Sequence, residues 1–103
     1  MGADLRGLAD IDRVIHEPAR YLIMACLYVV ESADFLFLER QTGLTKGNLS
    51  SHLGKLESSD YVQIRKEFLN KKPHTMLALT PAGRKAFDAY RKNMKHLLGR
   101  LPE

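Results

Sequence analysis

The sequence predicts a mainly α-helical fold with one small β-hairpin, in the α+β class. Apolar residues recur at helical spacing along most of the chain, a pattern of period two begins at Val62, and a helix start signal returns at Thr80-Pro81. The chain has 103 residues, of which 45% are hydrophobic and 27% charged. This length and composition suit one globular domain spanning residues 1–103.

Two helices are predicted in the first 30 residues. The first, over about residues 1–16, has one apolar stripe with spacings of three and four residues, formed by Leu5, Leu8, Ile11 and Ile15. Pro18 suits the first position of the second helix, and residues 19–30 are apolar on almost every side. Such a helix is typical of the buried centre of a small domain, so we expect Cys26 within it to be buried and unreactive.

A pair of helices with a short turn follows. Residues 35–42 form a short apolar segment that stops at Gly43, which suits the left-handed turn after a helix. Thr45 is a good N-cap for a helix that continues to about Ser58. One face of that helix is apolar, with Leu49, Leu53 and Leu56. Two helices joined in this way are typical of a helix-turn-helix.

The hairpin and the last helix complete the order of elements. Residues 62–68 alternate between apolar and polar, residues 70–73 form a basic turn, and residues 75–79 read as the returning strand. A helix then runs from Pro81 to about Leu98. Its apolar stripe consists of Ala86, Tyr90, Met94, Leu97 and Leu101. The order of helices, turn, hairpin and long helix is that of a winged helix-turn-helix.

The motifs themselves are similar to those of a known group. The stretch LERQTGLTKGNLSSHLGKLESSDYV, followed after the hairpin by LTPAGR, Phe87 and Tyr90, resembles the small winged-helix transcription regulators of the MarR- and ArsR-like group. The resemblance covers roughly residues 15–98. It implies a DNA-binding regulator with terminal dimerisation helices at about residues 1–16 and 81–101. The paired cysteines of metal-sensing members are missing, and the chain is shorter than a full MarR protein, so a small-molecule effector is possible but unidentified.

The helix over about residues 45–58 is the predicted recognition helix. An α-helix fits the major groove when its exposed face offers short polar side chains and cations. Such residues lie opposite the leucines: Thr45, Lys46, Gly47, Asn48, Ser50, Ser51, His52 and Lys55. Asn48 is suited to reading adenine edges, whereas Lys46 and Lys55 suit phosphates or guanine. The alternative is that this face is simply the solvated side of an amphipathic helix.

The hairpin, over about residues 65–75, is the second predicted DNA contact. It carries four cations, at Arg65, Lys66, Lys71 and Lys72. A basic hairpin tip can enter the minor groove or lie on phosphates. The alternative is that these lysines only keep an exposed strand soluble.

The distribution of charge favours a polyanionic partner. The net charge is +4 and the isoelectric point about 9.4. Residues 1–40 carry four basic and seven acidic side chains, whereas residues 41–103 carry twelve basic and five acidic ones, a net +7. A basic part beside an acidic part indicates one surface that faces nucleic acid, although a solvated charged surface is the alternative.

Enzymatic and membrane functions find no support. The four histidines, His16, His52, His74 and His96, lie far apart, there is one cysteine, and no phosphate-binding or nucleophile motif occurs. We therefore expect no catalysis, no metal and no cofactor. The longest apolar run, residues 21–30, is about half the length of a membrane span, and no signal peptide precedes it. A cytoplasmic location with no membrane partner is expected.

These inferences predict a homodimeric, sequence-specific transcription regulator that binds duplex DNA. A single small domain contacts one half-site, whereas a two-fold dimer presents two recognition helices to successive major grooves. The predicted dimer interface combines the two terminal stripes: Leu5, Leu8, Ile11, Ile15, Ala86, Tyr90, Met94, Leu97 and Leu101. The alternatives are terminal helices that pack only within their own chain, and a winged-helix adaptor whose recognition helix binds a protein.

Overall fold

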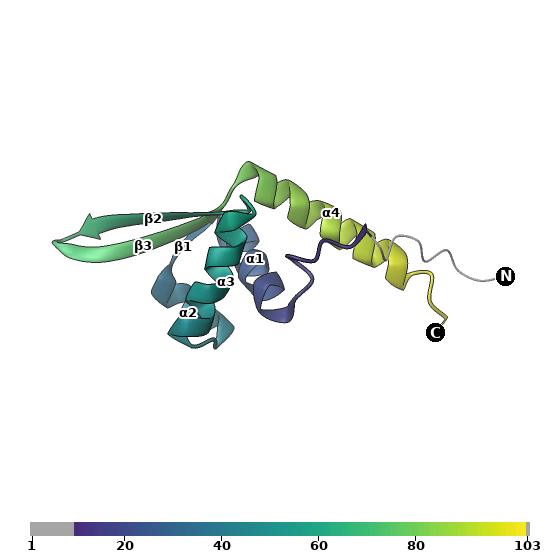
Figure 1. Ribbon diagram of the computed structural model, residues 1–103, viewed down its shortest axis with the longest axis horizontal. Helices are drawn as coiled ribbons and strands as arrows, with labels where there is room; N and C mark the ends of the chain where they lie inside the picture. The colour runs from purple at the N-terminus through teal and green to yellow at the C-terminus, as the bar shows by residue number, and fades with distance from the viewer. Residues whose placement is uncertain (1–9, 103) are drawn as a thin grey trace.

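Four α-helices and a three-stranded antiparallel sheet make up residues 10–102, the part of the chain that the computed structural model describes (Figure 1). The order of elements is α1 (Pro18–Val30), β1 (Ser32–Asp34), α2 (Phe35–Thr42), α3 (Lys46–Ser58), β2 (Val62–Leu69), β3 (Lys72–Leu79) and α4 (Pro81–Leu98). The predicted α+β class and the winged helix-turn-helix order are confirmed.

The hydrophobic core lies between the first three helices, the base of the sheet and the start of α4. Its fully or almost fully buried side chains include Ile23, Met24, Leu27, Leu49, Leu53, Leu56, Leu77 and Phe87. The three leucines of α3 are those predicted to share one face, and their burial turns the polar face of α3 outward. Among residues 10–102, no helix combines the length and apolar character needed to cross a membrane.

Local signals fix where the helices begin and end. Each helix follows a residue whose side-chain oxygen accepts N–H groups of the first turn: Glu17, Asp34, Thr45 and Thr80. These bonds satisfy donors that a helix start otherwise leaves unpaired. Helix α2 ends at Gly43, which has the left-handed φ of 71°. The predicted roles of Gly43, Thr45 and Thr80 are confirmed.

A short strand, β1, was not predicted. It pairs with β3 in the register Ser32↔Ala78 to Asp34↔Met76, so the sheet has the order β1-β3-β2. Three residues are too few to show a period-two pattern, and their partner lies far along the chain. This pairing ties the start of the helix-turn-helix to the base of the hairpin.

The two long strands form the wing. Strands β2 and β3 pair from Val62↔Leu79 to Leu69↔Lys72, and Asn70 and Lys71 make the turn with φ values of 53° and 66°. Figure 1 shows the wing projecting from one end of the body, while α4 extends toward the opposite end. The molecule is accordingly elongated, with extents of 64 × 25 × 21 Å.

The predicted N-terminal helix is wrong in the part that the structure describes. Residues 11–17 form turns, in which the Asp12 carboxylate accepts the N–H groups of Val14 and Ile15. An aspartate that bonds to nearby backbone in this way competes with a helix. Ile15 is fully buried in the core of its own chain. Leu5 and Leu8 lie outside the described residues.

Two tyrosines hold this irregular segment against the domain. The Tyr61 hydroxyl donates to Asp12, and the Tyr90 hydroxyl lies 2.8 Å from Nδ1 of His16. Burial, together with the hydrogen bond to the Asp12 carboxylate and its charge, raises the pKa of Tyr61 to about 12. The phenol of Tyr61 is therefore a donor throughout the neutral range.

The base of the wing requires a glycine in α4. A Cβ atom at Gly83 would meet the carbonyl group of Tyr61 far inside contact distance, and that group cannot move because it accepts the Thr80 N–H at 3.0 Å.

Gly83→Ala should lower the free energy of unfolding by about 3 kcal/mol or more, measured by urea denaturation. Gly54→Ala is the control, because its Cβ meets nothing within 4 Å. It should raise stability by up to about 1 kcal/mol. Equal stability of the two variants would contradict the contact.

Tyr61 also predicts a dependence of stability on alkaline pH. Its pKa is raised in the folded chain, so its contribution is fully present below about pH 10, the pKa of an unfolded tyrosine. The contribution is lost as pH rises through about 12. Tyr61→Phe should cost about 1–2 kcal/mol at pH 8 and less as pH rises from 10 to 12. Burial also raises the pKa of Tyr90, so the difference between the two proteins is the quantity to measure. A difference that stays constant up to pH 12 would refute this role.

Candidate nucleic-acid interface

The predicted recognition helix presents most of its polar residues to solvent. The exposed ones are Thr45, Lys46, Gly47, Asn48, Ser50, Ser51 and Lys55. The hydroxyl of Thr45 is engaged as the N-cap, because it accepts the N–H of Asn48 at 3.2 Å. The Asn48 side chain, one turn into the helix, is exposed and has its amide available.

Small residues occupy the centre of this exposed face. At 100° per residue, Gly47, Ser51 and Ser58 fall on the line opposite the buried leucines. A Cβ at Gly47 would meet nothing within 4 Å, so this position is open to whatever approaches the helix. Short side chains let a large partner come close to the helix backbone, as a helix in the major groove must do.

His52 is placed differently from its neighbours. It is half-buried and turned toward the start of α1, with Nδ1 at 3.1 Å from the Arg20 guanidinium and 3.3 Å from the Glu17 carboxylate. Burial acts to raise the pKa of Glu17, but bonds from the backbone and the charges of His52 and Arg20 outweigh it, and the net shift is downward. His52 therefore ties α3 to α1, which differs from its predicted place on the outward face.

The wing divides its predicted cations between two faces. Residues that alternate along β2 lie on opposite faces, so Lys66 shares the face of the buried-side Ile64, while Arg65 lies on the other. Arg65 also pairs with Glu67 at 3.5 Å, and His74 on β3 pairs with Asp34 at 3.6 Å. Lys71 and Lys72 are exposed at the tip.

A groove of about 800 Å³ separates α3 from the wing. It is lined by Phe35, Ser50, Leu53, Gly54, Glu57, Ile64, Lys66, Thr75 and Leu77. Ser50, Lys66 and Thr75 supply hydrogen-bond donors from both walls, whereas Glu57 supplies one negative charge. The exposed face of α3 and one face of the wing thus border a single concave surface, in which Phe35, Leu53, Ile64 and Leu77 supply the apolar part of the lining.

The tip of the wing is more apolar than the sequence suggested. Phe68 has 78% of its surface exposed and Leu69 57%. The alternating pattern predicted a strand over residues 62–68 and placed Phe68 on the same face as Ile64, without showing whether Phe68 is covered. The strand runs beyond the end of the core, so an inward-facing position there has nothing to cover it.

Several residues of the predicted dimer interface lie inside the single chain. Tyr90 is buried beside Tyr21, with ring centroids 5.9 Å apart, and Leu97 is only 5% exposed. Together with Ile15, these side chains occupy the interior, which differs from the place predicted for them between subunits. Ile11, Ala86 and Met94 are partly buried, and Leu101 is 51% exposed. A helical stripe shows that a face is covered but not which chain covers it.

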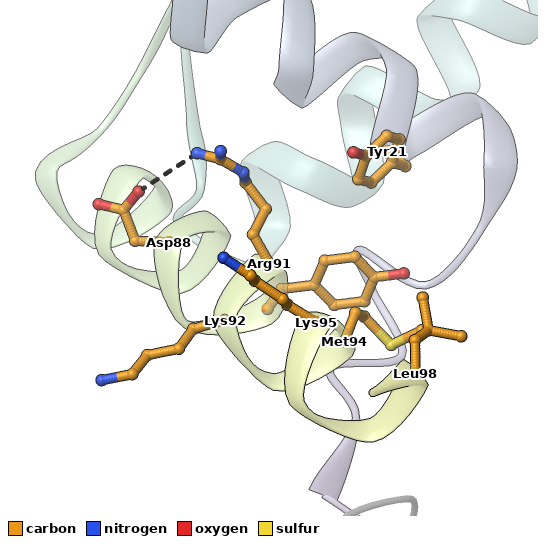
Figure 2. A pocket seen from close by; sticks show the side chains of 8 residues that line it. Tyr21, Asp88, Arg91, Lys92, Met94, Lys95 and Leu98 are labelled. Carbon is orange, nitrogen blue, oxygen red and sulfur yellow. Dashed lines mark ion pairs between the residues drawn. The ribbon is translucent and has the colours of Figure 1, made fainter. Parts of the chain in front are cut away.

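A second apolar surface lies between α1 and α4. Figure 2 shows Tyr21 of α1 opposite Met94 and Leu98 of α4, with cationic side chains along the rim. The groove has a volume of about 630 Å³, and Leu98 is 60% exposed. Arg91 lies 3.9 Å from Asp88 at its edge.

Helix α1 contributes further exposed apolar residues, among them Leu22 and Val29, the latter 79% exposed. The prediction that α1 is buried all round is therefore wrong for its outer side. The sequence did carry a signal for this exposed apolar surface. Helix α1 is apolar on almost every side, but residues 10–102 cover only one side of it, so the other side is left exposed. Cys26 is half-buried rather than fully buried, and burial raises the pKa of its thiol.

The part of the chain that the structure describes offers no arrangement of side chains suited to binding a metal ion. No three His, Cys, Asp or Glu side chains within residues 10–102 are grouped closely enough to hold an ion.

Comparison with known proteins agrees with this architecture. The winged helix DNA-binding domain family matches residues 19–98. An uncharacterized protein of Methanocaldococcus jannaschii is 35% identical over 78 residues, which cover 76% of this chain and 85% of that protein.

Two solved structures are similar in shape. The transcriptional regulator homologue from Pyrococcus horikoshii OT3 has a TM-score of 0.86 and 26% identity, over 92% of this chain and 96% of the other. AbfR of Staphylococcus epidermidis, solved bound to DNA, has a TM-score of 0.67 and 22% identity. The match covers 81% of this chain and 55% of AbfR, so that likeness concerns the fold alone.

Proposed function

The chain belongs to the winged helix DNA-binding domain family, a non-enzymatic family, and we propose that it is a transcription regulator that binds specific duplex sites as a homodimer. One observation carries the proposal: the exposed polar face of α3 and the Lys66 face of the wing border the same groove. Helix α3 lies in the major groove, and the wing reaches the neighbouring minor groove.

The charges of the two elements support this arrangement. Lys46 and Lys55 flank the outer face of α3, and Lys66, Lys71 and Lys72 follow the wing. Within residues 10–102 these five lysines form no ion pair with a carboxylate. Their charges are free to replace the counterions of DNA, which is the main source of affinity for the phosphate backbone.

The side chains divide into base-reading and backbone-contacting groups. Asn48 is the exposed amide near the start of α3, where recognition helices contact base edges. Lys66, Lys71 and Lys72 contact phosphates. Arg65 is paired with Glu67 on the far face of the wing, and His52 is turned toward α1. The role of these two residues is to hold the wing and α3 in position.

A dimer fits the second surface. The groove between α1 and α4 has Tyr21, Met94 and Leu98 in its lining and charged side chains at its rim, and no part of residues 10–102 covers it. Pairing of this surface about a two-fold axis places two α3 helices on successive major grooves, about 34 Å apart. The DNA-bound state of AbfR and the regulator homologue of Pyrococcus horikoshii support DNA as the partner.

Binding to duplex DNA and its dependence on salt test the proposal. Sites selected from a random duplex pool should bind with an affinity that falls steeply as salt rises, because counterions are released. Lys71→Ala combined with Lys72→Ala should weaken all sequences alike and reduce the log–log salt slope by about 2 for each subunit, or about 4 for the dimer. Asn48→Ala should cost about 1–3 kcal/mol on the preferred site and relax preference at one base pair.

Two outcomes count against this assignment. Absence of duplex binding at low salt would refute DNA binding and favour a winged-helix adaptor. A wing variant that changes base preference, with uniform loss for Asn48→Ala, would reverse the roles of the two elements.

Sedimentation equilibrium tests the dimer. The intact chain should have twice the monomer mass at micromolar concentration, and Leu98→Glu should shift it to a monomer, because a charge would be buried in the interface. Leu36→Glu is a matched control, since Leu36 is also exposed, at 53%, but lies on α2. A monomeric parent, or a Leu98→Glu variant that stays dimeric, would exclude this interface.

A further inference from the structure

The wing ends in two large apolar side chains that the fold does not use. Phe68 is 78% exposed and Leu69 57%, although most large apolar side chains of the described chain are covered. Neither residue belongs to the hydrophobic core or to the side chains packed against it. Removing either one should therefore leave the stability of the domain unchanged.

The turn presents this pair in a fixed position. Asn70 and Lys71 both have left-handed φ values, the geometry of a tight two-residue hairpin turn. Phe68 lies opposite Pro73 and Leu69 opposite Lys72 in the ladder. A partner that accepts these side chains meets a preformed tip, and it does not have to order a flexible loop.

The reach of the wing matches the spacing of DNA grooves. Strand β2 has eight residues, and its end-to-end length is about 23 Å at about 3.3 Å per residue. With α3 in the major groove, the adjacent minor groove lies half a helical turn away, about 17 Å. The tip is therefore long enough to enter the minor groove.

The surrounding charges point to the same occupant. Lys66, Lys71 and Lys72 lie within four residues of Phe68, and the one carboxylate in that stretch of the sequence, Glu67, pairs with Arg65, so cations predominate near the apolar pair. These cations oppose pairing with the wing of a second copy. Phe68 also lies on the face of β2 that carries Lys66 and borders the α3 groove, so the tip continues the surface assigned to DNA.

We propose that the tip of the wing, with Phe68 on the Lys66 face and Leu69 on the opposite face, is an apolar wedge that enters the minor groove, inserts at a base step and bends the duplex. The inference rests on the proposed DNA binding. Apolar side chains inserted in this way unstack a base step, and the resulting bend brings more of the duplex against the protein. Specificity at the wedge then comes from steps that deform easily, such as pyrimidine–purine steps.

Energy transfer between dyes at the two ends of a selected duplex measures the bend. Phe68→Ala combined with Leu69→Ala should straighten the bound duplex and lower the affinity about tenfold or more, with the salt slope unchanged. Lys71→Ala with Lys72→Ala should reduce the slope while the bend persists at saturating protein. Leu36→Ala is the control for loss of an exposed apolar side chain, since Leu36 is 53% exposed on α2 and lies outside the proposed dimer surface. It should change neither bend nor affinity.

The remaining outcomes separate the wedge from DNA binding itself. A double variant that binds and bends the duplex like the parent overturns the wedge and leaves DNA binding intact. A parent that binds no duplex overturns both. An unchanged bend, with loss of binding to phosphatidylglycerol vesicles only in the double variant, would assign the tip to an anionic membrane surface and overturn the wedge. Equal urea midpoints for all variants confirm that each is folded.

Discussion

The close contact between Tyr61 and Gly83 sets the direction of the wing and of α4 together. The chain enters the hairpin at Tyr61 and leaves it at Thr80, and a backbone hydrogen bond joins these two residues. The Thr80 hydroxyl accepts the Gly83 N–H and donates to the Asp60 carbonyl, so one side chain closes the hairpin and starts the helix. With no Cβ at Gly83, α4 starts directly against the backbone of Tyr61, the residue before β2. The angle between wing and recognition helix follows from this junction.

The same junction separates two surfaces of different character. On one side, α3 and the wing border a groove of mixed lining, and exposed lysines of both elements lie around it. On the other, α1 and α4 leave an apolar strip, beside which Tyr28 stacks with the guanidinium of Arg84 and bonds to Asp88. Helix α4 begins at the base of the wing and ends far from it, so one continuous helix connects the two surfaces (Figure 1).

Local signals in the sequence were sufficient for most of the fold. Thr45, Gly43 and Thr80 carry their information in a few neighbouring residues, and the helix and hairpin boundaries follow from them. Strand β1 was missed because only its distant partner makes it a strand. The site was predicted at the level of elements: the exposed face of α3 is confirmed as exposed, but the inward turn of His52 depends on Glu17 and Arg20, more than thirty residues away. Which chain covers an apolar stripe is likewise a tertiary property, and so Tyr90 was misplaced.

The irregular segment of residues 11–17 has a consequence for the order in which the molecule folds and opens. Its contacts from Asp12 to Tyr61 and from His16 to Tyr90 span 49 and 74 residues, whereas the hairpin and the helix pairs join neighbours along the chain. Closing such long loops carries the larger entropy cost, so we expect this segment to dock last and to detach first. Its amides should therefore exchange with solvent faster than those of α1. Each such opening exposes Tyr90, which lies beside the apolar strip. The apolar surface of the strip is then transiently larger than in the closed molecule.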